Sequence, residues 1–579
     1  MKPHLLFVAT LTCFSVHNHA YSQLNQIKLA QVSGNNINAR IHNTGVLFSD
    51  MSFSDGAAFE VPIGSNSHAF CSAALTMGGL DSNQQLRAAS AYRELTDYAK
   101  GPLTVGGASR SDSVELKYNR IWQVNRNQVT QHRNSFSDPT YAIPIDILEW
   151  PAHGDTTAGY DFYLAPFVDV NQNGVYEPRT GDYPDVKGDF SFYFINNDGS
   201  VKNYTSSVSM GVEIHCMVYG YSTSNPLNEA LFVDYKVINR SRTTYTDFYI
   251  GQFVDPDLGN YTDDYIEADV SRGMVFVKNG DSLDDNPPNG QAGYGIRPGA
   301  AGVLVLKGPY LDSNRLDDSC LVSPFYTPNG WGFKDDVIDN ERLGLTYFMP
   351  INNTSFNNGM PDLAVHHYSY MRGIWQNGLL LNFGGNGFFP ITGPTCRIAY
   401  FGDTDPTYYS TFGDTVANDW TEDGNNPPGD RLAMLSSGPI TFTPQEELDL
   451  TYAFIFARDT SQIGVNASVD TLKSSADFVR EFYFTLNRLS NCFNSVGIEE
   501  RSSQNITVYP VPTSNYIRIN NLTQRSNYQL FSLNGKLMKE GDLSGSGEQI
   551  DLSGFKNGVY IFHLQNTDGL QQIKVIVSK

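Results

Sequence analysis

Alternating oxygen-bearing side chains in one short segment are the pattern in this sequence that most clearly suggests chemistry. Residues 169–177 read DVNQNGVYE, which matches the first half of a calcium-binding loop, D-x-[DN]-x-[DN]-G. Oxygens at alternate positions of such a loop converge on one cation because the chain curls around it, and the glycine allows the sharp turn. The expected calcium ligands are Asp169, Asn171, Asn173, the carbonyl of Val175, Glu177 and Asp182.

The context of this loop differs from that of an EF-hand. Thr180 stands where an EF-hand requires a bidentate glutamate, and prolines at positions 166, 178 and 184 favour a loop over flanking helices. Asp182 is therefore expected to complete the site from a strand-flanked loop. A connection rich in Asx turns is the alternative, because Asn and Gly favour turns even where no ion binds.

A second acidic cluster follows an apolar run that is typical of a strand. Residues 255–269 contain six carboxylates within fifteen positions, and at close range these would repel one another. A divalent cation that takes several oxygen ligands would relieve the repulsion, whereas a solvated acidic loop is the alternative. The expected ligands are Asp255, Asp257, Asp263, Asp264, Glu267 and Asp269.

Smaller acidic groups and the tryptophans give weaker signals. The pairs at 284–285 and 422–423 are expected at the surface, and Asp430 is expected to pair with Arg431 in a turn. Tryptophans at 331, 375 and 420 are expected in the core, with a carbohydrate-binding platform as the alternative. The sequence contains no GxSxG, HExxH or GxxxxGK[ST] motif, so no signature of a catalytic nucleophile, a zinc protease or a P-loop is found.

Short β-type runs separated by Gly, Pro and Asn-Gly turns must position these groups. Runs at 231–238, 247–254, 274–278, 303–306 and 450–457 predict strands, and the last is apolar on both alternating faces, as in a central strand. One helix is predicted at 469–484, where apolar residues recur at helical spacing, namely Val469, Leu472, Ala476, Val479 and Phe482.

The composition agrees with an all-β protein. The chain has 579 residues, of which 40% are apolar and 13% aromatic, with 51 Gly and 28 Pro. Aromatic residues favour strands, and Gly and Pro favour turns. The predicted fold is a large multi-sheet β-sandwich body with few helices, followed by a small C-terminal Ig-like β-sandwich. The formal net charge of −22 disfavours nucleic acid as a partner, because an acidic surface repels phosphate backbones.

The two ends of the chain differ from the body. Residues 1–22 resemble a signal peptide, since a short apolar run precedes small residues at a cleavage site, and no transmembrane segment is expected in the mature chain. β-rich regions are expected at 23–205 and 206–492, a linker at 493–504 and a module at 505–579. Most of the five mature cysteines are expected to be buried thiols, with one or two long-range disulfides as the alternative.

The C-terminal module carries a family resemblance. VYPVPT opens it at 508–513, YQLFSLNGK and GVYIF follow at 528–536 and 558–562, and KVIVSK ends the chain. In order and spacing these elements resemble the type A C-terminal sorting domain of type IX secretion cargo, although Val511 replaces the Asn of the family's YPNP opening. The matching sorting-signal residues are Tyr509, Pro510, Pro512, Gly535, Gly558, Tyr560 and Lys574.

The resemblance implies a route and a location. Cargo of this family passes through the periplasm and is moved across the outer membrane by the type IX secretion machinery, after which the domain is usually cleaved and often replaced by a surface lipopolysaccharide anchor. The protein is therefore expected to be secreted or held at the outer cell surface. Segments of the body at 70–81, 181–184 and 265–269 resemble large uncharacterised proteins that carry the same domain, and these supply no activity to transfer.

Two functional hypotheses follow. The first is a calcium-stabilised β protein with a non-catalytic binding or structural role, for which glycans or other surface molecules are the expected ligands. The alternative is a secreted hydrolase that acts on polysaccharide through paired carboxylates, which requires two carboxylates facing each other in a cleft. Carboxylates that close around one ion would favour the first hypothesis, and carboxylates across an aromatic-lined groove would favour the second.

Overall fold

The computed structural model describes residues 27–50, 56–199, 204–320, 326–354, 356–389 and 393–487 of the body, and residues 507–509, 513–520, 522, 525–532, 537–556, 558–566 and 569–577 near the C-terminus. The expected signal peptide at 1–22 and the expected linker at 493–504 lie outside the described residues. The chain divides into two compact units, residues 1–495 and 496–579. Each unit is described by itself.

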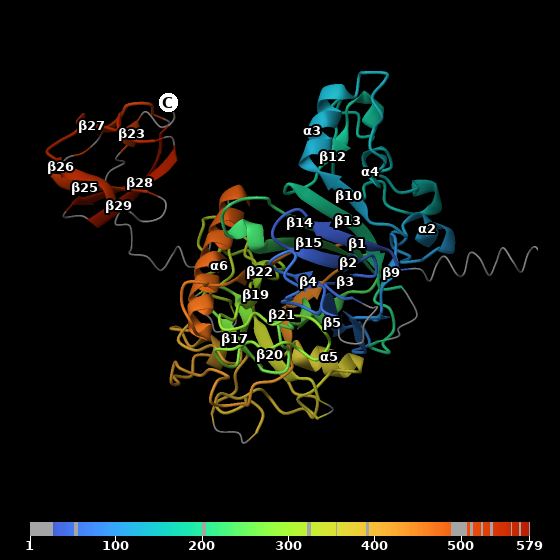
Figure 1. The fold of residues 1–579 in the computed structure, drawn as a ribbon. Coiled ribbons are helices and arrows are strands. Elements are labelled where there is room, and N and C mark those ends of the chain that lie inside the picture. Colours follow the sequence, from blue (N-terminus) through green and yellow to red (C-terminus); the bar gives the residue numbers. More distant parts are fainter. Residues whose placement is uncertain are drawn as a thin grey trace, which may run out of the picture. The chain divides into compact units, whose positions relative to one another are not determined.

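Two antiparallel nine-stranded sheets form the body (Figure 1). The first sheet has the order β1-β2-β3-β5-β16-β21-β20, with β4 beside β2 and β6 beside β5. The early strands form one half of this sheet and the late strands form the other half, and the two halves meet where β5 pairs with β16. Its strands are β1 (Leu29–Ser33), β2 (Asn38–His42), β3 (Val46–Leu47), β4 (Phe59–Glu60), β5 (Ser72–Leu80), β6 (Leu86–Ala89), β16 (Tyr245–Asp255), β20 (Tyr347–Asn352) and β21 (Arg431–Phe442).

The second sheet has the order β10-β13-β14-β15-β22-β19-β18-β17, with β9 beside β13. Each run predicted as a strand between 231 and 457 lies in a sheet, the run at 247–254 in the first and the others in the second. The run at 450–457 is a central strand, as expected. The strands are β9 (Ala99–Lys100), β10 (Trp122–Asn125), β13 (Phe190–Asn197), β14 (Val212–Gly220), β15 (Ala230–Asn239), β17 (Asp264–Asp269), β18 (Met274–Asn279), β19 (Ala300–Lys307) and β22 (Glu447–Ala457).

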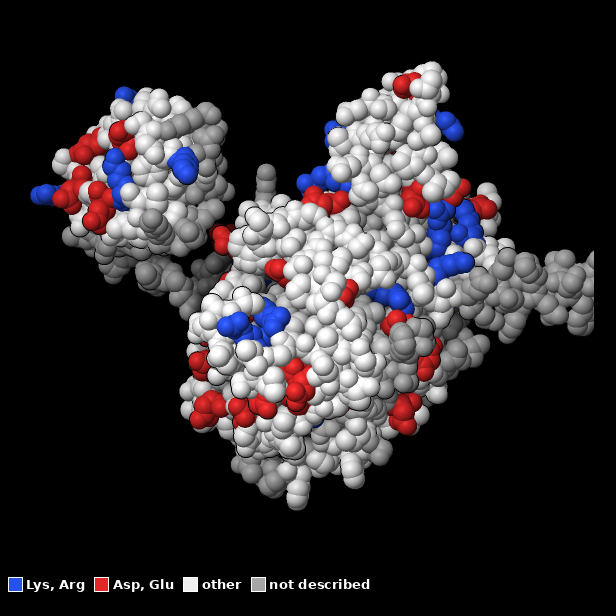
Figure 2. Space-filling model, viewed as in Figure 1, with Lys and Arg blue, Asp and Glu red and all other residues white. Residues whose placement is uncertain are grey.

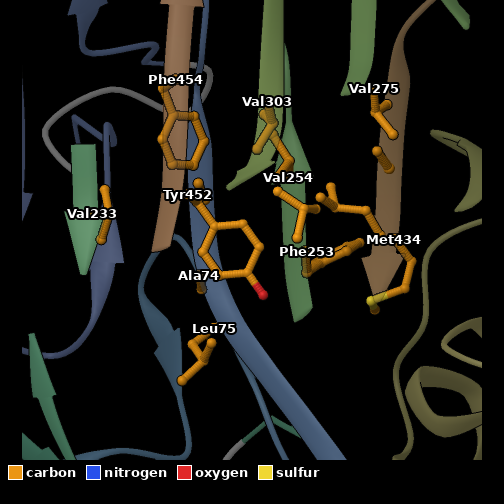
Figure 3. Close-up of a cluster of buried hydrophobic side chains, with 14 of the residues drawn as sticks. Ala74, Leu75, Val233, Phe253, Val254, Val275, Val303, Met434, Tyr452 and Phe454 are labelled. Carbon is orange, nitrogen blue, oxygen red and sulfur yellow. The ribbon is translucent and has the colours of Figure 1, made fainter. Parts of the chain in front are cut away.

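The main hydrophobic core lies between the two sheets. Side chains alternate along each strand, so that Val233, Tyr235 and Val237 of β15 enter this core while Asp234 and Lys236 point to the other face. Figure 3 shows part of this core, with Phe454 and Val303 from the second sheet and Phe253 and Met434 from the first. Regions 23–205 and 206–492 therefore share one core and contribute strands to the same two sheets.

The outer face of the second sheet is covered by two separate parts of the chain. On one side lies helix α6 (Val465–Asn487), whose buried face includes Val469, Leu472, Ala476 and Val479, as the spacing predicts. On the other side a lobe made by the segment between β10 and β13 extends beyond the sheets (Figure 1). The lobe and its surroundings contain α2 (Asp112–Lys117), α3 (Arg126–Ser135), α4 (Ile145–Leu148), β11 (Phe167–Val168) and β12 (Tyr183–Pro184).

The remaining elements of the body are short. They are β7 (Ala91–Tyr92), β8 (Leu95–Thr96), α5 (Ala364–Tyr370) and the single-turn 3-10 helices Thr156–Ala158, Pro178–Thr180, Pro226–Glu229 and Tyr409–Thr411. Cys71, Cys216 and Cys396 are buried free thiols, as expected for most cysteines. Cys320 is disulfide-bonded, and its partner lies outside the described residues.

The C-terminal unit has its own small core between two antiparallel sheets. One sheet has the order β23-β24-β27 and the other the order β26-β25-β28-β29. Ile517, Leu530, Phe562 and Val575 are among the residues that fill the core. The strands are β23 (Thr507–Tyr509), β24 (Tyr516–Asn520), β25 (Ser526–Ser532), β26 (Leu537–Leu543), β27 (Gln549–Asp551), β28 (Gly558–Asn566) and β29 (Gly569–Val577).

Candidate metal site

Two neighbouring carboxylates and a third that is distant in sequence meet where strands β16 and β21 of the first sheet lie side by side. Asp255 ends β16, Asp257 follows two residues later, and Asp430 directly precedes β21. Because β16 and β21 are antiparallel neighbours, the end of one strand lies beside the start of the other. One carboxylate oxygen from each of the three residues lies within 4.8 Å of the corresponding oxygens of the other two.

The three side chains are largely removed from water. Asp255 is 4% exposed and Asp257 is 6% exposed, whereas Asp430 is half-buried. The hydroxyl of Tyr92 donates a hydrogen bond of 2.7 Å to Oδ2 of Asp255. The second oxygen of Asp255, Oδ1, is buried and accepts no hydrogen bond from the described residues. An unsatisfied buried carboxylate oxygen is unfavourable unless something binds it.

Burial and mutual repulsion raise the pKa values of these acids. Burial, followed by the nearby Asp430 carboxylate, raises the pKa of Asp255 to about 7. Burial, followed by the charges of Asp255 and Asp430, raises the pKa of Asp257 well above its usual range. The Arg93 guanidinium opposes both shifts but does not cancel them. The cluster therefore favours a proton or a cation over bare negative charge.

A buried thiol lies beside the same acids. Cys71 directly precedes β5, and its backbone N–H donates to the carbonyl of Asp255 over 2.8 Å. Burial, and then the charges of Asp257 and Asp255, raise the pKa of the Cys71 thiol well above its usual range. The thiol is thus held in its protonated form, which is not a metal ligand. The available ligand atoms are therefore carboxylate oxygens, which suit a hard cation such as calcium.

Two further acids of the predicted cluster lie near the trio but form a separate group. Asp264 is fully buried, and its Oδ2 accepts the N–H of Leu258 over 3.1 Å. Asp284 accepts the N–H groups of Asn260 and Tyr294, and burial followed by the Asp284 charge raises the pKa of Asp264 well above its usual range. Asp263 is half-buried, and burial followed by Asp281 raises its pKa to about 6.

The last two acids of the predicted cluster are neutralised by basic side chains. Glu267 forms a 2.9 Å ion pair with Lys278 across the β17–β18 register, and Asp269 forms a 2.7 Å ion pair with Arg272. All four side chains are buried or half-buried, so these ion pairs are shielded from solvent. The structure thus divides the six carboxylates of 255–269 into three environments.

The predicted calcium loop lies in the lobe and curls as expected, with Gly174 at a φ of 79°. The Asp169 carboxylate accepts the N–H groups of Gln172 and Gly174 over 2.7 and 2.6 Å. Asn171 and Asn173 accept N–H groups two residues further on, and Glu177 accepts the amide of Asn173 over 2.6 Å. These are the contacts of Asx turns.

Asp182 links the two ends of this loop through its carboxylate. Its side chain is fully buried and accepts the N–H groups of Val170 and Glu177 over 2.9 and 2.8 Å. It therefore joins the two ends of the segment. Val175 is 42% exposed at the rim. In this geometry the loop is held by its own backbone donors.

Several acids occupy positions that the sequence did not indicate. Asp284 and Glu422, which were expected at the surface, are 2% and 0% exposed. Arg431 pairs with Glu422 over 2.8 Å. The Asp430 carboxylate accepts the side-chain amide of Asn353 over 2.7 Å and also contributes an oxygen to the trio. No local motif marks Asp430 as a partner of Asp255, because only the pairing of β16 with β21 brings them together.

The three tryptophans singled out in the sequence lie in the core, as expected. Trp331, Trp375 and Trp420 are 7%, 1% and 3% exposed, and a buried ring cannot serve as an open platform for a sugar. Figure 2 shows that one face of the body carries its charged side chains in separate small groups, with uncharged surface between them. The three tryptophans therefore form no aromatic platform at the surface.

The sorting-signal residues lie in the C-terminal unit. Tyr509 of β23 is 41% exposed, Gly558 begins β28, and Tyr560 is buried with its hydroxyl donating to the carbonyl of Lys556 over 3.0 Å. Lys574 is in β29 and faces Ile561 in the β28–β29 register. Pro510, Pro512 and Gly535 lie outside the described residues.

Comparison with known proteins identifies this unit. Residues 507–578 match the family described as the secretion system C-terminal sorting domain. The protein is thus a secreted or cell-surface β protein. More particularly, it carries a type IX secretion sorting domain, as the motifs predicted, and this domain implies interaction with the type IX secretion machinery.

Comparisons of the whole chain give little more. No curated protein matches it. Among solved structures, a polysaccharide lyase aligns with 8% identity and a TM-score of 0.18 over 63% of this chain and 34% of the lyase, so the chain spans about a third of that protein's length. PorZ, a surface component of the type IX secretion system of Porphyromonas gingivalis, aligns with 9% identity and a TM-score of 0.12 over 95% of this chain and 75% of PorZ. Both TM-scores are too low to carry an argument about fold or function.

Within the part of the chain that the structure describes, no helix is both long enough and apolar enough to cross a membrane.

Proposed function

We propose that this protein is a secreted or cell-surface β-sandwich protein that calcium stabilises, with a non-catalytic binding or structural role. The observation that carries the proposal is the convergence of Asp255, Asp257 and Asp430 at the junction of β16 and β21. The Arg93 guanidinium does not cancel the burial and mutual repulsion of these three carboxylates, so a further positive charge would stabilise them. A calcium ion bound there would join two central strands of the first sheet.

The donor set fits calcium. Carboxylate oxygens are the ligands that this cation prefers, and backbone carbonyls and water usually complete its coordination. The buried Oδ1 of Asp255 has no hydrogen-bond donor among the described residues, so it is available to an ion. Tyr92 orients the other oxygen of the same carboxylate. The loop at 169–182 is a second candidate, although its carboxylate and amide oxygens already accept backbone N–H groups.

The hydrolase alternative is less well supported at these acids. A glycosidase needs two carboxylates that face a substrate across an open cleft. Asp255 and Asp257 are buried, and the more prominent cavities of the described residues are lined by other side chains. Burial of this kind suits an ion, which is small, rather than a sugar ring. We therefore favour a structural role for the carboxylate trio.

Terbium luminescence tests the proposal directly. Terbium substitutes for calcium, and its emission rises when a tyrosine lies close to the bound ion. Tyr92 donates to the Asp255 carboxylate over 2.7 Å, so terbium in the trio should be sensitised by this ring. Calcium should displace terbium and abolish the signal. Asp255→Asn should remove this emission, and Tyr92→Phe should weaken it without removing the ion.

Two control variants make the outcome specific. Asp414→Asn removes the same charge from an exposed position and should leave the emission unchanged. Asp169→Asn removes a candidate ligand from the loop in the lobe and reports on that loop alone. An equal number of bound ions in the wild type and in Asp255→Asn would show that the trio binds no cation, and the structural calcium site would then have to be abandoned.

A further inference from the structure

A large cleft lies on the outer face of the second sheet, between the lobe and helix α6. Its volume is about 750 Å³, within the range of pockets that bind small organic ligands. Tyr163 and Phe167 of the lobe line one side, and Tyr483 of α6 lines the other. The floor is formed by outward-facing residues of β14, β15, β19 and β22. None of the metal ligands proposed above at the β16–β21 junction lines this cleft.

The floor is a lattice of ion pairs. Lys187 contacts Asp234 at 2.5 Å, and Lys236 contacts Glu447 at 2.7 Å. A third pair joins Lys307 to Asp449 at 3.8 Å. Each lysine on the floor therefore has its own carboxylate, and the three pairs together carry no net charge. Asp169 and Asp185 also line the cleft, so its lining holds five acidic residues against three lysines. Such a surface presents donors and acceptors side by side and does not attract an anionic ligand.

The acceptors on the floor are held in fixed positions. Oδ1 of Asp234 accepts the hydroxyl of Thr451 over 2.8 Å, and the hydroxyl of Tyr483 donates to Thr451 over 2.9 Å. Next to them, His215 lies between Tyr193 and Glu213, with contacts of 2.6 and 2.8 Å. Preorganised polar groups lose little conformational entropy when a ligand binds.

Glu213 fixes the orientation of the His215 ring. Burial tends to raise the pKa of Glu213, but the hydrogen bonds and charges of His215 and Arg240 outweigh it and lower this pKa to about 2. Glu213 is therefore an ionised acceptor. His215 contacts this carboxylate through Nε2 and the hydroxyl of Tyr193 through Nδ1, so both ring nitrogens are engaged.

The lobe supplies an exposed aromatic face. Tyr163 is 57% exposed, although its ring packs edge-on against Phe162 with centroids 4.9 Å apart. His153 contacts both rings and also Phe167. A Cβ atom at Gly174 would lie 3.0 Å from the hydroxyl of Tyr163, so the loop at 169–177 lies close to the hydroxyl end of this side chain. The platform is thus open to solvent but braced.

We propose that this cleft binds a neutral oligosaccharide. An exposed, braced aromatic ring suits the apolar face of a sugar, and the neutral lattice of lysines and carboxylates suits its hydroxyl groups, which both donate and accept. An acidic polysaccharide is a poorer match, because each lysine on the floor is already paired with a carboxylate. The inference deepens the binding role proposed above and does not depend on the calcium site.

The same ion pairs indicate binding rather than cleavage. Glycoside hydrolysis needs one carboxyl group that is protonated and can donate to the leaving oxygen. On the floor of the cleft, Asp234, Glu447 and Asp449 are instead each engaged in an ion pair with a lysine. The floor thus supplies acceptors beside donors, a pattern that suits the binding of sugar hydroxyls.

Isothermal titration of the full mature chain tests this inference. Neutral hexasaccharides of glucose, xylose and mannose are the probes, with hexagalacturonate as the acidic comparison. At least one neutral probe should bind, and Tyr163→Ala should weaken it on the order of tenfold. Tyr163→Phe keeps the ring and should bind within a small factor of the wild type. Tyr310→Ala, which removes another exposed tyrosine outside the cleft, is the matched control and should bind normally.

Three results would overturn the proposal. They are the absence of binding to every neutral probe, tighter binding of hexagalacturonate than of any neutral probe, and neutral binding that Tyr163→Ala leaves unchanged. Terbium titration of the same samples keeps the two proposals separate. Loss of sugar binding in Tyr163→Ala with a normal terbium signal supports the cleft, and failure of the calcium site leaves the sugar result intact.

Discussion

Replacing Asp257 by Asn should lower the thermal stability in calcium but not in chelator. In calcium the substitution weakens a ligand of the trio, so the variant should melt below the wild type. In chelator it removes a buried negative charge that Asp255 and Asp430 repel, so the variant should melt at the same temperature or higher. Asn keeps the shape of the side chain, which limits loss of packing as an explanation.

The size of the calcium effect can be worked out. A site filled at a hundred times its dissociation constant stabilises the folded state by about 2.7 kcal/mol. An ordered body of about 460 residues has an unfolding entropy of about 1 kcal/mol/K, taking about 2.1 cal/mol/K per residue. Calcium should therefore raise the melting temperature of the wild type by about 3 °C. A larger rise would indicate tighter or additional sites.

Differential scanning calorimetry of four samples decides the matter, namely wild type and Asp257→Asn, each with calcium and with chelator. Asp414→Asn provides the matched control, since it removes an exposed charge and should respond to calcium as the wild type does. If calcium did not change the melting temperature of the wild type, the proposed stabilisation by calcium would be refuted. An Asp257→Asn variant that is destabilised equally in both conditions would also refute it, because that result would assign the residue a purely structural role.

Further predictions concern other parts of the molecule. Deleting residues 507–579 should leave a folded body in the periplasm, measured by cell fractionation and protease resistance, and normal surface delivery would contradict the sorting assignment. Leu472→Ala should lower the free energy of unfolding by about 2–5 kcal/mol, because Leu472 is fully buried on the inner face of α6, whereas Leu486→Ala at a 59% exposed position of the same helix should have little effect. Glu213 has a folded pKa of about 2, below its unfolded value of 4.5, so its contribution is present above pH 4.5 and is lost as the pH falls towards 2. That contribution is about 3 kcal/mol, and urea unfolding should show a shallower acid dependence for Glu213→Gln than for the wild type.

The strands were accessible from the sequence because local pattern determines them. The apolar run at 450–457 and the spacing of Val469, Leu472, Ala476 and Val479 indicate β22 and α6 without knowledge of their neighbours. The motifs of the C-terminal unit likewise indicate its identity. These features depend on residues close together in the chain, which is why a single sequence reveals them.

The candidate sites depend on strand order, which local pattern does not contain. Asp255 and Asp257 stand out as acids after an apolar run, but Asp430 joins them only because β16 pairs with β21. Glu267 similarly finds Lys278 through the β17–β18 register. The cleft depends on strand order even more, because its floor is formed by strands that are far apart in the sequence, from β14 to β22. The density of acidic residues in the sequence therefore indicated an acidic region, but it did not indicate which carboxylates form the site.

The pairing of early strands with late strands has a consequence for the time at which the body can fold. β5 must find β16, β16 must find β21, and β15 must find β22, which begins at Glu447. Contacts between such distant segments require the closure of long loops, and proteins rich in them fold slowly. During synthesis neither sheet can be completed until nearly the whole body has been made. The sorting domain at 507–578 is synthesised soon after β22. The secretion signal is therefore complete shortly after the body first becomes able to fold.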